Sequence, residues 1–385
     1  MTAALWTHTE AAAATKGRVS GEWSATGVSI DSRNLASGDL FIAIRGDNSD
    51  GHAYVDAALA NGACAAMVRS DWSDAPKGAP LLVVDNTDVG MADLGRAARA
   101  RTDAKIVGVT GSVGKTSTKE MLAVALGAIG KTTATQGNLN NHWGLPLSLA
   151  RLPRDAEFGV FELGMNHAGE IEPLSLMVRP GVAVITTVEA VHLEFFENEE
   201  GIADAKAEIF AGMTAEGIAV LNRDNRHFDR LAEAAKSAGL SRICSFGSAR
   251  DATVRLVSIS SDDDGSDIAA AIGDEVLVFR LGAPGQHLAM NSLAVLGALH
   301  SLGIDHRRAA RALDSFHPMK GRGQRHSVRL DDGDFTLIDE SYNASPASMR
   351  AALEVLRLCS APRTARLFMA RCCPGAPRRK TRTSS

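Results

Sequence analysis

The sequence predicts an α/β fold built on a doubly wound, mostly parallel sheet, and three observations carry this prediction. An apolar strand over residues 105–110 leads into a glycine loop and then into an amphipathic helix that begins at Lys115. Beyond this loop, strand-like and helix-like segments alternate, which is typical of a parallel sheet covered by helices. At 385 residues the chain is too long for one ordinary core, so we expect two or three domains.

The glycine loop has the composition of a phosphate cradle. Its glycines let successive backbone N–H groups point at an anion, and the following helix adds the partial positive charge of its N-terminus. Lys115 supplies a mobile cation, and Thr116 offers a hydroxyl for magnesium. The strict P-loop pattern requires a further glycine where this chain has Val109, so the match is to a shorter form. An ordinary strand-to-helix turn is the alternative, but the flanking strand and helix favour nucleotide phosphate. The loop residues are Gly111, Ser112, Val113 and Gly114, followed by Lys115, Thr116 and Ser117.

Composition excludes several classes of protein. Hydrophobic residues make up 45% of the chain and charged residues 22%, and the formal net charge is -4. This balance predicts a globular protein without an electrostatic footprint for nucleic acid or an anionic membrane. We find no apolar run long enough to span a bilayer and no signal peptide, so we expect no membrane insertion and a cytoplasmic location. The five cysteines lack paired spacing, which predicts neither disulfides nor a zinc site.

Residues 1–102 are expected to form a small α/β unit. Its predicted strands are 28–33, 39–44, 65–68 and 81–85, and its predicted helices are 52–61 and 89–101. Asp31, Ser32 and Arg33 follow the first strand and are candidates for holding a polar or phosphorylated ligand. The alternative is a salt-bridged surface turn, which composition alone favours.

The second unit places chemistry at one edge of its sheet. Predicted strands 158–163 and 182–187 deliver Glu162 and, in the following loop, His192. Because ligands bind at the carboxyl ends of parallel strands, these residues should meet the glycine loop in a metal-nucleotide site. A structural carboxylate and an ordinary loop histidine are the alternatives for each residue alone.

Lys206 interrupts an apolar stripe on the helix predicted over residues 201–213. Ile202, Ile209 and Met213 recur at helical spacing, and Lys206 lies on the same stripe. A buried lysine at this position would indicate a functional role. The alternative is that its aliphatic stem extends along the surface so that the ammonium group reaches solvent.

The remaining segments are less specific. The loop over residues 136–146 carries Asn138, Asn140 and Asn141, whose amides suit a sugar or phosphate ester, with turn formation as the competing explanation. Later elements are expected as strands 254–259 and 275–279 around an antiparallel turn, helices 288–302 and 306–315, a linker at 319–323, a strand at 335–339 and a helix at 348–358.

Together these stretches resemble the Mur ligase family, most closely a member that adds a dipeptide. The matching stretches begin at residues 31–33 and 38–41, the loop at 111–120, residues 137–146 and 162–165. They continue at 192–196, 205–209, 285–291, 321–322 and 339–346. The resemblance covers the chain from the first unit to about residue 358.

The resemblance implies three domains. Residues 1–102 would bind the uridine-diphosphate end of UDP-N-acetylmuramoyl-tripeptide, and residues 103–317 would form the central P-loop domain for ATP and two Mg²⁺ ions. Residues 318–385 would be an incomplete C-terminal α/β ligase domain for D-alanyl-D-alanine, with a disordered tail from about residue 360. The implied activity is ATP-dependent amide ligation through an acyl phosphate, by a monomer, in peptidoglycan precursor synthesis.

The resemblance also implies residue roles. The catalytic residues would be Lys115, His192 and Lys206, the last as a carbamate. ATP would contact residues 111–117, Asn291, Arg322, Asp339, Tyr342 and Asn343. The metal ligands would be Thr116, Glu162, His192 and carbamylated Lys206, and the substrate-binding residues Asp31, Ser32, Arg33, Asn138, Asn140 and Asn141.

The end of the sequence departs from the family. Residues 367–373 are followed by a basic, proline-rich ending where relatives continue with an apolar strand and an acidic motif, so a frameshift and an inactive chain are expectations to test. The alternatives are another Mur ligase, a folylpolyglutamate synthetase-like ligase, and a nucleotide-binding protein without ligase activity.

Overall fold

The computed structural model describes residues 4–46, 49–190, 194–330, 333–342 and 345–358. The predicted tail, along with His192 and Asn343, lies outside these residues. Within the described ranges, no helix combines the length and apolar character needed to cross a bilayer.

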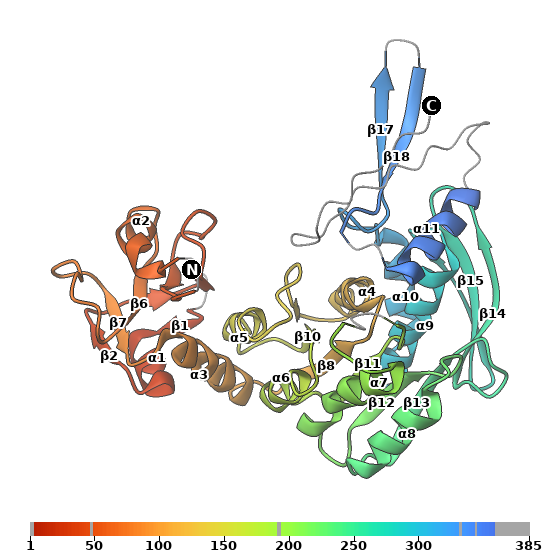
Figure 1. Cartoon of the computed structure of the whole chain (residues 1–385), viewed down its shortest axis with the longest axis horizontal. Helices are drawn as coiled ribbons and strands as arrows, with labels where there is room; N and C mark the ends of the chain where they lie inside the picture. The colour runs from red at the N-terminus through yellow and green to blue at the C-terminus, as the bar shows by residue number, and fades with distance from the viewer. Residues whose placement is uncertain (1–3, 47–48, 191–193, 331–332, 343–344, 359–385) are drawn as a thin grey trace.

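The first part of the chain folds around a five-stranded sheet with the strand order β2-β7-β6-β5-β4 (Figure 1). Strands β4 to β7 are parallel, and the edge strand β2 pairs with β7 in the antiparallel sense. The strand predicted from residue 28 ends at Ser29, because the Ser29 hydroxyl accepts from the backbone N–H of Asp31 and begins a turn. The strands are β2 (Arg18–Ser20), β4 (Gly27–Ser29), β5 (Asp39–Ile42), β6 (Ala65–Arg69) and β7 (Leu81–Val84), beside the small pair β1 (Trp6–Thr7) and β3 (Ser24–Ala25). The helices are α1 (His8–Thr15), η1 (Gly51–Tyr54), α2 (Val55–Ala60) and α3 (Thr87–Ala100).

A nine-stranded sheet with the order β16-β15-β14-β13-β12-β11-β8-β10-β9 organises the centre. It is parallel from β9 through β14, and β14 to β16 form the predicted antiparallel excursion. The predicted doubly wound, mostly parallel sheet is therefore confirmed. Its strands are β8 (Lys105–Thr110), β9 (Thr132–Ala134), β10 (Phe158–Glu162), β11 (Val182–Ile185), β12 (Ile218–Asn222), β13 (Arg242–Gly247), β14 (Val254–Ser261), β15 (Ser266–Ile272) and β16 (Glu275–Leu281).

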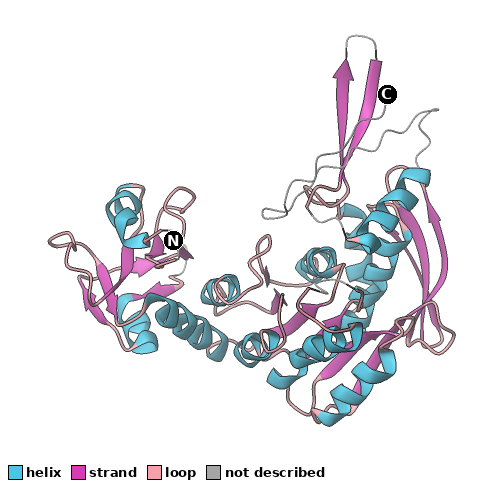
Figure 2. Ribbon diagram, in the orientation of Figure 1, coloured by secondary structure: helices cyan, strands magenta, loops and turns pink. Residues whose placement is uncertain are grey.

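Both faces of the parallel part of this sheet are buried under helices (Figure 2), whereas Val276 and Val278 on the edge strand β16 are exposed. On β11, Val182 and Val184 belong to one hydrophobic core, while Ala183 and Ile185 belong to the other. This explains why the parallel strands read as continuous apolar runs. The covering helices are α4 (Lys115–Gly127), α5 (Gly144–Ala150), α6 (Ile171–Val178), α7 (Glu199–Ala207), η2 (Glu208–Gly212), α8 (Phe228–Ser237), α9 (Gln286–Ser301), α10 (His306–Arg311) and η3 (Ala312–Ser315).

The first and central parts share one hydrophobic core. Helix α3 packs against both α1 and α5, and this core continues from Trp6 and Leu94 into the central unit at Leu145. Polar contacts cross the same boundary, since the indole Nε1 of Trp6 donates to the carbonyl oxygen of Ala150 at 2.9 Å and Arg151 Nε donates to that of Val28 at 2.6 Å. The predicted domain boundaries near residues 102 and 317 stay predictions.

The last described part is a hairpin and a helix. Among the described residues, strands β17 (Gln324–Leu330) and β18 (Gly333–Asp339) pair only with each other, and they project from the molecule (Figure 1). Helix α11 (Pro346–Leu358) places Val355 against Gly285 at the start of α9. Strand β18 and α11 were predicted. Strand β17 was not, because its mixture of polar and charged residues carries no apolar alternation.

Candidate nucleotide and metal site

The phosphate loop joins the carboxyl end of β8 to the first turn of α4, and β8 lies between β11 and β10 in the nine-stranded sheet. Gly114 has a φ of 84°, and a Cβ added there would lie 2.6 Å from Oδ1 of Asn291. A Cβ on Gly111 would lie 1.9 Å from Oγ1 of Thr186. Both positions therefore require glycine, and the backbone conformation fits an anion cradle.

Lys115 folds back over this loop. Its Nζ donates to the carbonyl oxygens of Gly111 at 2.6 Å and Ser112 at 3.3 Å. Burial lowers the pKa of Lys115 below its ordinary value; the carboxylate of Glu162 opposes this shift, and the guanidinium of Arg322 adds to it. These charges therefore act on one another across the site, and Arg322 comes from beyond the central sheet.

Glu162 is the last residue of β10, and one of its two buried carboxylate oxygens accepts a hydrogen bond. The side chain is 1% exposed, and Oε1 accepts a hydrogen bond of 2.7 Å from Nδ2 of Asn140. Oε2 is buried and has no hydrogen-bond partner among the described residues. Thr116, in the first turn of α4, is also buried. An unpaired carboxylate oxygen and a hydroxyl are both oxygen donors of the kind that Mg²⁺ prefers.

Lys206 is 2% exposed, so its stem does not extend to solvent. The expected helix is α7 continued by the 3-10 turn η2, and Lys206 lies in the last turn of α7. Its pKa is lowered well below the ordinary value, first by burial and then by repulsion from Lys115, while Glu208 acts in the opposite direction. The lysine that interrupts the apolar stripe, Lys206, is therefore buried, and it lies near Lys115.

His192 lies outside the residues that the structure describes. Before it, the Ser112 hydroxyl donates to the carbonyl oxygen of Glu189 at 3.1 Å, which ties this segment to the phosphate loop. No group of three or more potential His, Cys, Asp or Glu ligands occurs among the described residues. The predicted role of His192 stays a prediction.

The three asparagines of the predicted substrate loop have different surroundings. Asn140 is bonded to Glu162, and Oδ1 of Asn141 accepts from the backbone N–H groups of Trp143 and Gly144, which begins α5. Asn138 is exposed. Turn formation therefore accounts for Asn141, and substrate binding by this loop stays a prediction.

Asp31 and Arg33 form the salt-bridged turn that was the alternative reading. Arg33 Nε lies 2.9 Å from Oδ1 of Asp31, and hydrogen bonds from Arg33 lower the pKa of Asp31 to about 2. The Arg33 side chain is 83% exposed, so it remains accessible to a ligand. Ser32 is half-buried at the same turn.

The predicted nucleotide contacts from the last part of the chain gather at one turn. The Arg322 guanidinium stacks 4.0 Å from the centre of the Tyr342 ring. Asp339 accepts from the backbone N–H groups of Gly321 and Ser341, each at 3.0 Å. Asn291 lies against Gly114, which brings it to the phosphate loop. Contacts of these residues with ATP stay predictions.

Two residues near Glu162 received no role from the sequence. Lys119 is fully buried, and its Nζ contacts the Glu120 carboxylate and donates to the carbonyl oxygen of Thr135 at 2.7 Å. The Thr135 hydroxyl accepts from the backbone N–H of Glu162 at 3.2 Å. The position of Lys119, one helical turn after Lys115, could have indicated a role near the site. Its contact with Thr135 could not be predicted, because the two residues are distant in sequence.

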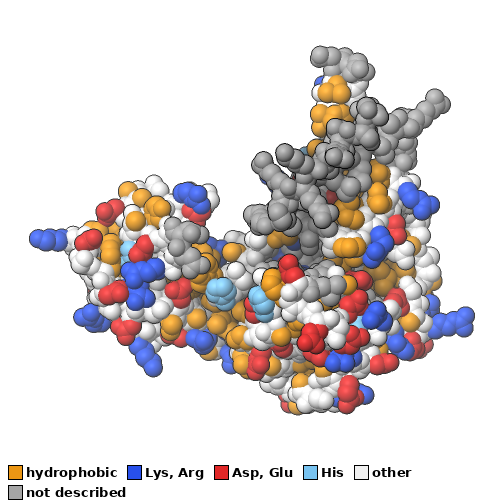
Figure 3. Space-filling view, viewed as in Figure 1, with side chains coloured by type: hydrophobic (Ala, Val, Ile, Leu, Met, Phe, Trp, Pro, Cys, Tyr) orange, Lys and Arg blue, Asp and Glu red, His pale blue; other side chains and the backbone are white. Residues whose placement is uncertain are grey.

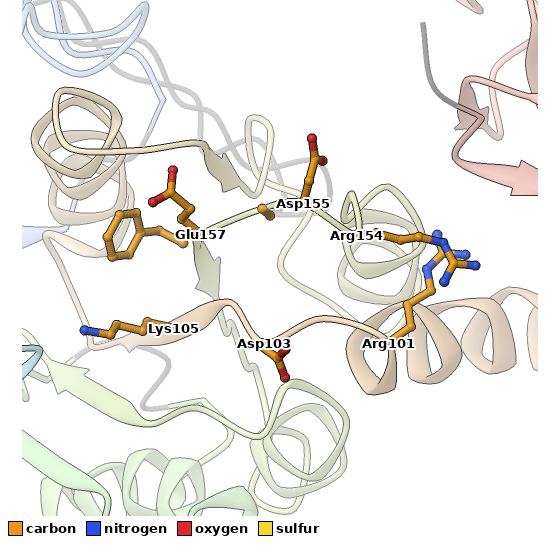
Figure 4. Close-up of a pocket in the computed structure, with 8 residues that line it drawn as sticks. Arg101, Asp103, Lys105, Arg154, Asp155 and Glu157 are labelled. Carbon is orange, nitrogen blue, oxygen red and sulfur yellow. The ribbon is translucent and has the colours of Figure 1, made fainter.

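Two cavities lie at the opposite ends of the strands. One, of about 420 Å³, is lined by the starts of β8 and β10 and by the ends of Arg101 and Arg154 (Figure 4). The other, of about 540 Å³, lies beside the starts of β8, β11 and β12. Since ligands of open α/β sheets bind at the carboxyl ends, we assign the site to the phosphate loop and not to these cavities.

Comparisons with known proteins point to one family. Residues 109–299 match the model of the Mur ligase middle domain, and residues 24–96 match that of the Mur ligase family, catalytic domain. The chain is 35% identical to UDP-N-acetylmuramoyl-tripeptide--D-alanyl-D-alanine ligase of Rickettsia prowazekii, over 86% of this chain and 72% of the relative. It is 34% identical to the Escherichia coli protein of the same name, over 86% and 71%.

Solved structures give the same result. The crystal structure of MurF from Acinetobacter baumannii is similar with a TM-score of 0.79 and 32% identity, over 92% of this chain and 76% of that one. MurF ligase from Thermotoga maritima in complex with ADP is similar with a TM-score of 0.70 and 28% identity, over 86% and 74%. A folylpolyglutamate synthetase (FPGS) from L. casei, at 13% identity, shares the fold alone. The chain belongs to the Mur ligase family.

Proposed function

We propose that this chain is an ATP-dependent amide ligase that joins D-alanyl-D-alanine to UDP-N-acetylmuramoyl-tripeptide in peptidoglycan precursor synthesis. One observation carries the proposal: the glycine cradle with Lys115 lies within electrostatic reach of the buried Glu162 and of the buried Lys206. The names of the relatives support the substrates, and the ADP complex of the Thermotoga maritima protein supports the nucleotide.

The phosphate loop would hold the β- and γ-phosphates of ATP. Lys115 now donates to two loop carbonyls, and an anion in the cradle would take its ammonium group instead. Asn291 beside Gly114 would contact the nucleotide, and Arg322 would approach from the third part of the chain. The stacked Tyr342, the neighbouring Asp339 and Asn343 would complete this side.

Magnesium fits the donor atoms present. Thr116 and the unpaired Oε2 of Glu162 would hold one ion, and His192 with a carbamate on Lys206 would hold a second. Bound there, Mg²⁺ would neutralise phosphate charge during transfer. Burial favours the neutral amine of Lys206, and only a neutral amine adds to carbon dioxide to form a carbamate.

The substrate would lie in the recess between the first part and the rest of the molecule, which has histidine side chains along its floor (Figure 3). Asp31, Ser32 and Arg33 would hold the uridine-diphosphate end, and the loop with Asn138, Asn140 and Asn141 would line the path toward the phosphate loop. We place this activity in the cytoplasm, where ATP and UDP-linked precursors occur, and propose that the chain acts as a monomer.

The reaction would proceed in two steps. A carboxylate oxygen of the tripeptide attacks the γ-phosphorus of ATP, the bond to ADP breaks, and an acyl phosphate forms. The amine of D-alanyl-D-alanine then attacks the acyl carbon, loses a proton, and phosphate leaves as the amide forms. Lys115 stabilises the charge on the transferring phosphoryl group, and exclusion of water protects the acyl phosphate.

The test is product formation by the full chain with ATP and Mg²⁺. With UDP-N-acetylmuramoyl-tripeptide and D-alanyl-D-alanine, mass spectrometry should find the pentapeptide and one phosphate per amide. Amide formation with a single amino acid in place of the dipeptide would indicate a sister ligase. Nucleotide binding without phosphate release would indicate a binding protein and would contradict the proposal.

A further inference from the structure

We propose that Asn140 is a positioning residue that orients Glu162 as a metal ligand, in addition to any contact of its loop with substrate. The inference rests on the proposed role of Glu162 in holding Mg²⁺. It goes beyond that role because it names the group that decides which oxygen of the carboxylate is free.

The hydrogen bond between the two side chains has only one possible direction. A carboxylate oxygen accepts, so the atom of Asn140 that lies 2.7 Å from Oε1 is the amide donor Nδ2. This bond occupies Oε1 and leaves Oε2 buried without a partner among the described residues. A carboxylate fixed through one oxygen presents the other as a monodentate ligand, which is how outer groups orient metal-binding carboxylates.

Asn140 is itself held in place by backbone contacts. The backbone carbonyl oxygen of Asn140 accepts from the backbone N–H of Gly164 at 2.9 Å, and Gly164 is two residues beyond the end of β10. A Cβ added to Gly164 would lie 2.8 Å from Cγ of Asn140, so the amide packs closely on the chain beyond the strand. The position of the side chain is therefore set by the same segment whose carboxylate it orients.

A second arm fixes the backbone of Glu162. The Thr135 hydroxyl accepts from the Glu162 N–H, and the Thr135 carbonyl oxygen accepts from the buried Nζ of Lys119 at 2.7 Å. Lys119 belongs to α4, the helix that begins with Lys115 and Thr116. The carboxylate is thereby tied to the phosphate-loop helix through its backbone and to Asn140 through its side chain.

The experiment measures Mn²⁺ binding to the full chain in the presence of ADP, with the electron paramagnetic resonance signal of free Mn²⁺ as the readout. Replacing a group that orients a metal ligand typically weakens metal binding by about 10- to 100-fold. We expect Asn140→Leu to weaken Mn²⁺ binding by this amount while metal-free ADP binding and the thermal unfolding midpoint change little. The matched control Asn166→Leu, at an exposed asparagine beyond β10 that has no proposed binding role, should leave Mn²⁺ affinity unchanged.

Two further variants separate the possible failures. Gly164→Ala displaces the Asn140 amide without altering it, and we expect it to weaken Mn²⁺ binding even if Asn140→Leu folds poorly. If Glu162→Gln weakens Mn²⁺ binding but Asn140→Leu and Gly164→Ala do not, the inference is wrong and the proposed metal site stands. If Glu162→Gln has no effect, both are wrong. An equal loss in Asn166→Leu would show that the effect does not depend on the contact between Asn140 and Glu162, and would overturn the inference.

Discussion

Lys206 is buried, and the positive charge of the half-buried Lys115 adds to burial in lowering the pKa of Lys206. Like charges in such surroundings are costly unless one is neutral or a negative group lies between them. A carbamate on Lys206 would remove one of the two positive charges and add a negative one. A phosphate group bound in the loop would neutralise the positive charge of Lys115.

The first prediction concerns this pair. Lys206→Ala should lower the rate of amide formation by at least about 100-fold, because a proposed metal-holding and charge-balancing group is lost. Acetate or formate added at high concentration should restore part of the activity by replacing the carbamate. Lys236→Ala, at an exposed lysine of α8, is the control and should retain full activity. Failure of short carboxylates to restore any activity would count against the carbamate.

Gly114 gives a second prediction. Alanine at its positive φ is strained, and its Cβ would press on the Asn291 side chain at 2.6 Å. Gly114→Ala should therefore weaken ADP binding, measured by calorimetry, by at least about tenfold, which corresponds to about 1.4 kcal/mol. Gly127→Ala in the same helix meets nothing within 4 Å and should leave ADP binding unchanged. Equal affinities in the two variants would show that the loop does not bind the phosphates.

A third prediction tests the shared core of the first and central parts. Trp6→Phe keeps an aromatic ring in the buried site but removes the Nε1 donor and leaves the Ala150 carbonyl without that bond. We expect a loss of about 1–3 kcal/mol in the free energy of unfolding, measured with urea. Trp72→Phe, at a half-buried residue of the first part, is the control and should cost less. An unchanged urea midpoint in Trp6→Phe would show that this contact adds no stability.

A fourth prediction concerns His287 and the pH dependence of the unfolding free energy. Burial lowers its pKa from 6.5 to about 4, and its Nδ1 has no hydrogen-bond partner among the described residues. Between these two values the unfolded chain binds a proton that the folded chain does not, so the unfolding free energy falls as pH falls from 6.5 to 4. The loss from this residue should reach about 2 kcal/mol at pH 5.

The variant His287→Leu isolates that contribution. Urea unfolding at pH 7 and pH 5 should show a smaller difference between the two pH values in the variant than in the parent chain. An identical difference in both proteins would show that His287 titrates normally.

The sequence predicted the parts of the fold that depend on local pattern. The apolar strands β8, β10 and β11 and the glycine loop were visible because buried parallel strands and positive-φ glycines leave clear signals. Strand β17 was missed because it is a half-exposed hairpin strand without apolar alternation.

The site was predictable only where a residue type is unusual for its place. Lys206 on an apolar stripe and Glu162 in an apolar strand were found this way. The pairing of Asn140 with Glu162 and of Lys119 with Thr135 was not, because it depends on segments that only the tertiary fold brings together. Asparagines in a loop also have a simpler explanation as turn residues, which holds for Asn141.

The most direct test of the proposed ligase reaction follows oxygen from the acceptor carboxylate. UDP-N-acetylmuramoyl-tripeptide labelled with ¹⁸O in its reacting carboxyl group is incubated with the full chain, ATP, Mg²⁺ and D-alanyl-D-alanine, and the released phosphate is analysed by mass spectrometry. Transfer of the γ-phosphoryl group to that carboxylate predicts one ¹⁸O atom in each phosphate, together with the pentapeptide product. Pentapeptide accompanied by unlabelled phosphate, or phosphate release without any amide, would contradict an acyl phosphate formed at this phosphate loop.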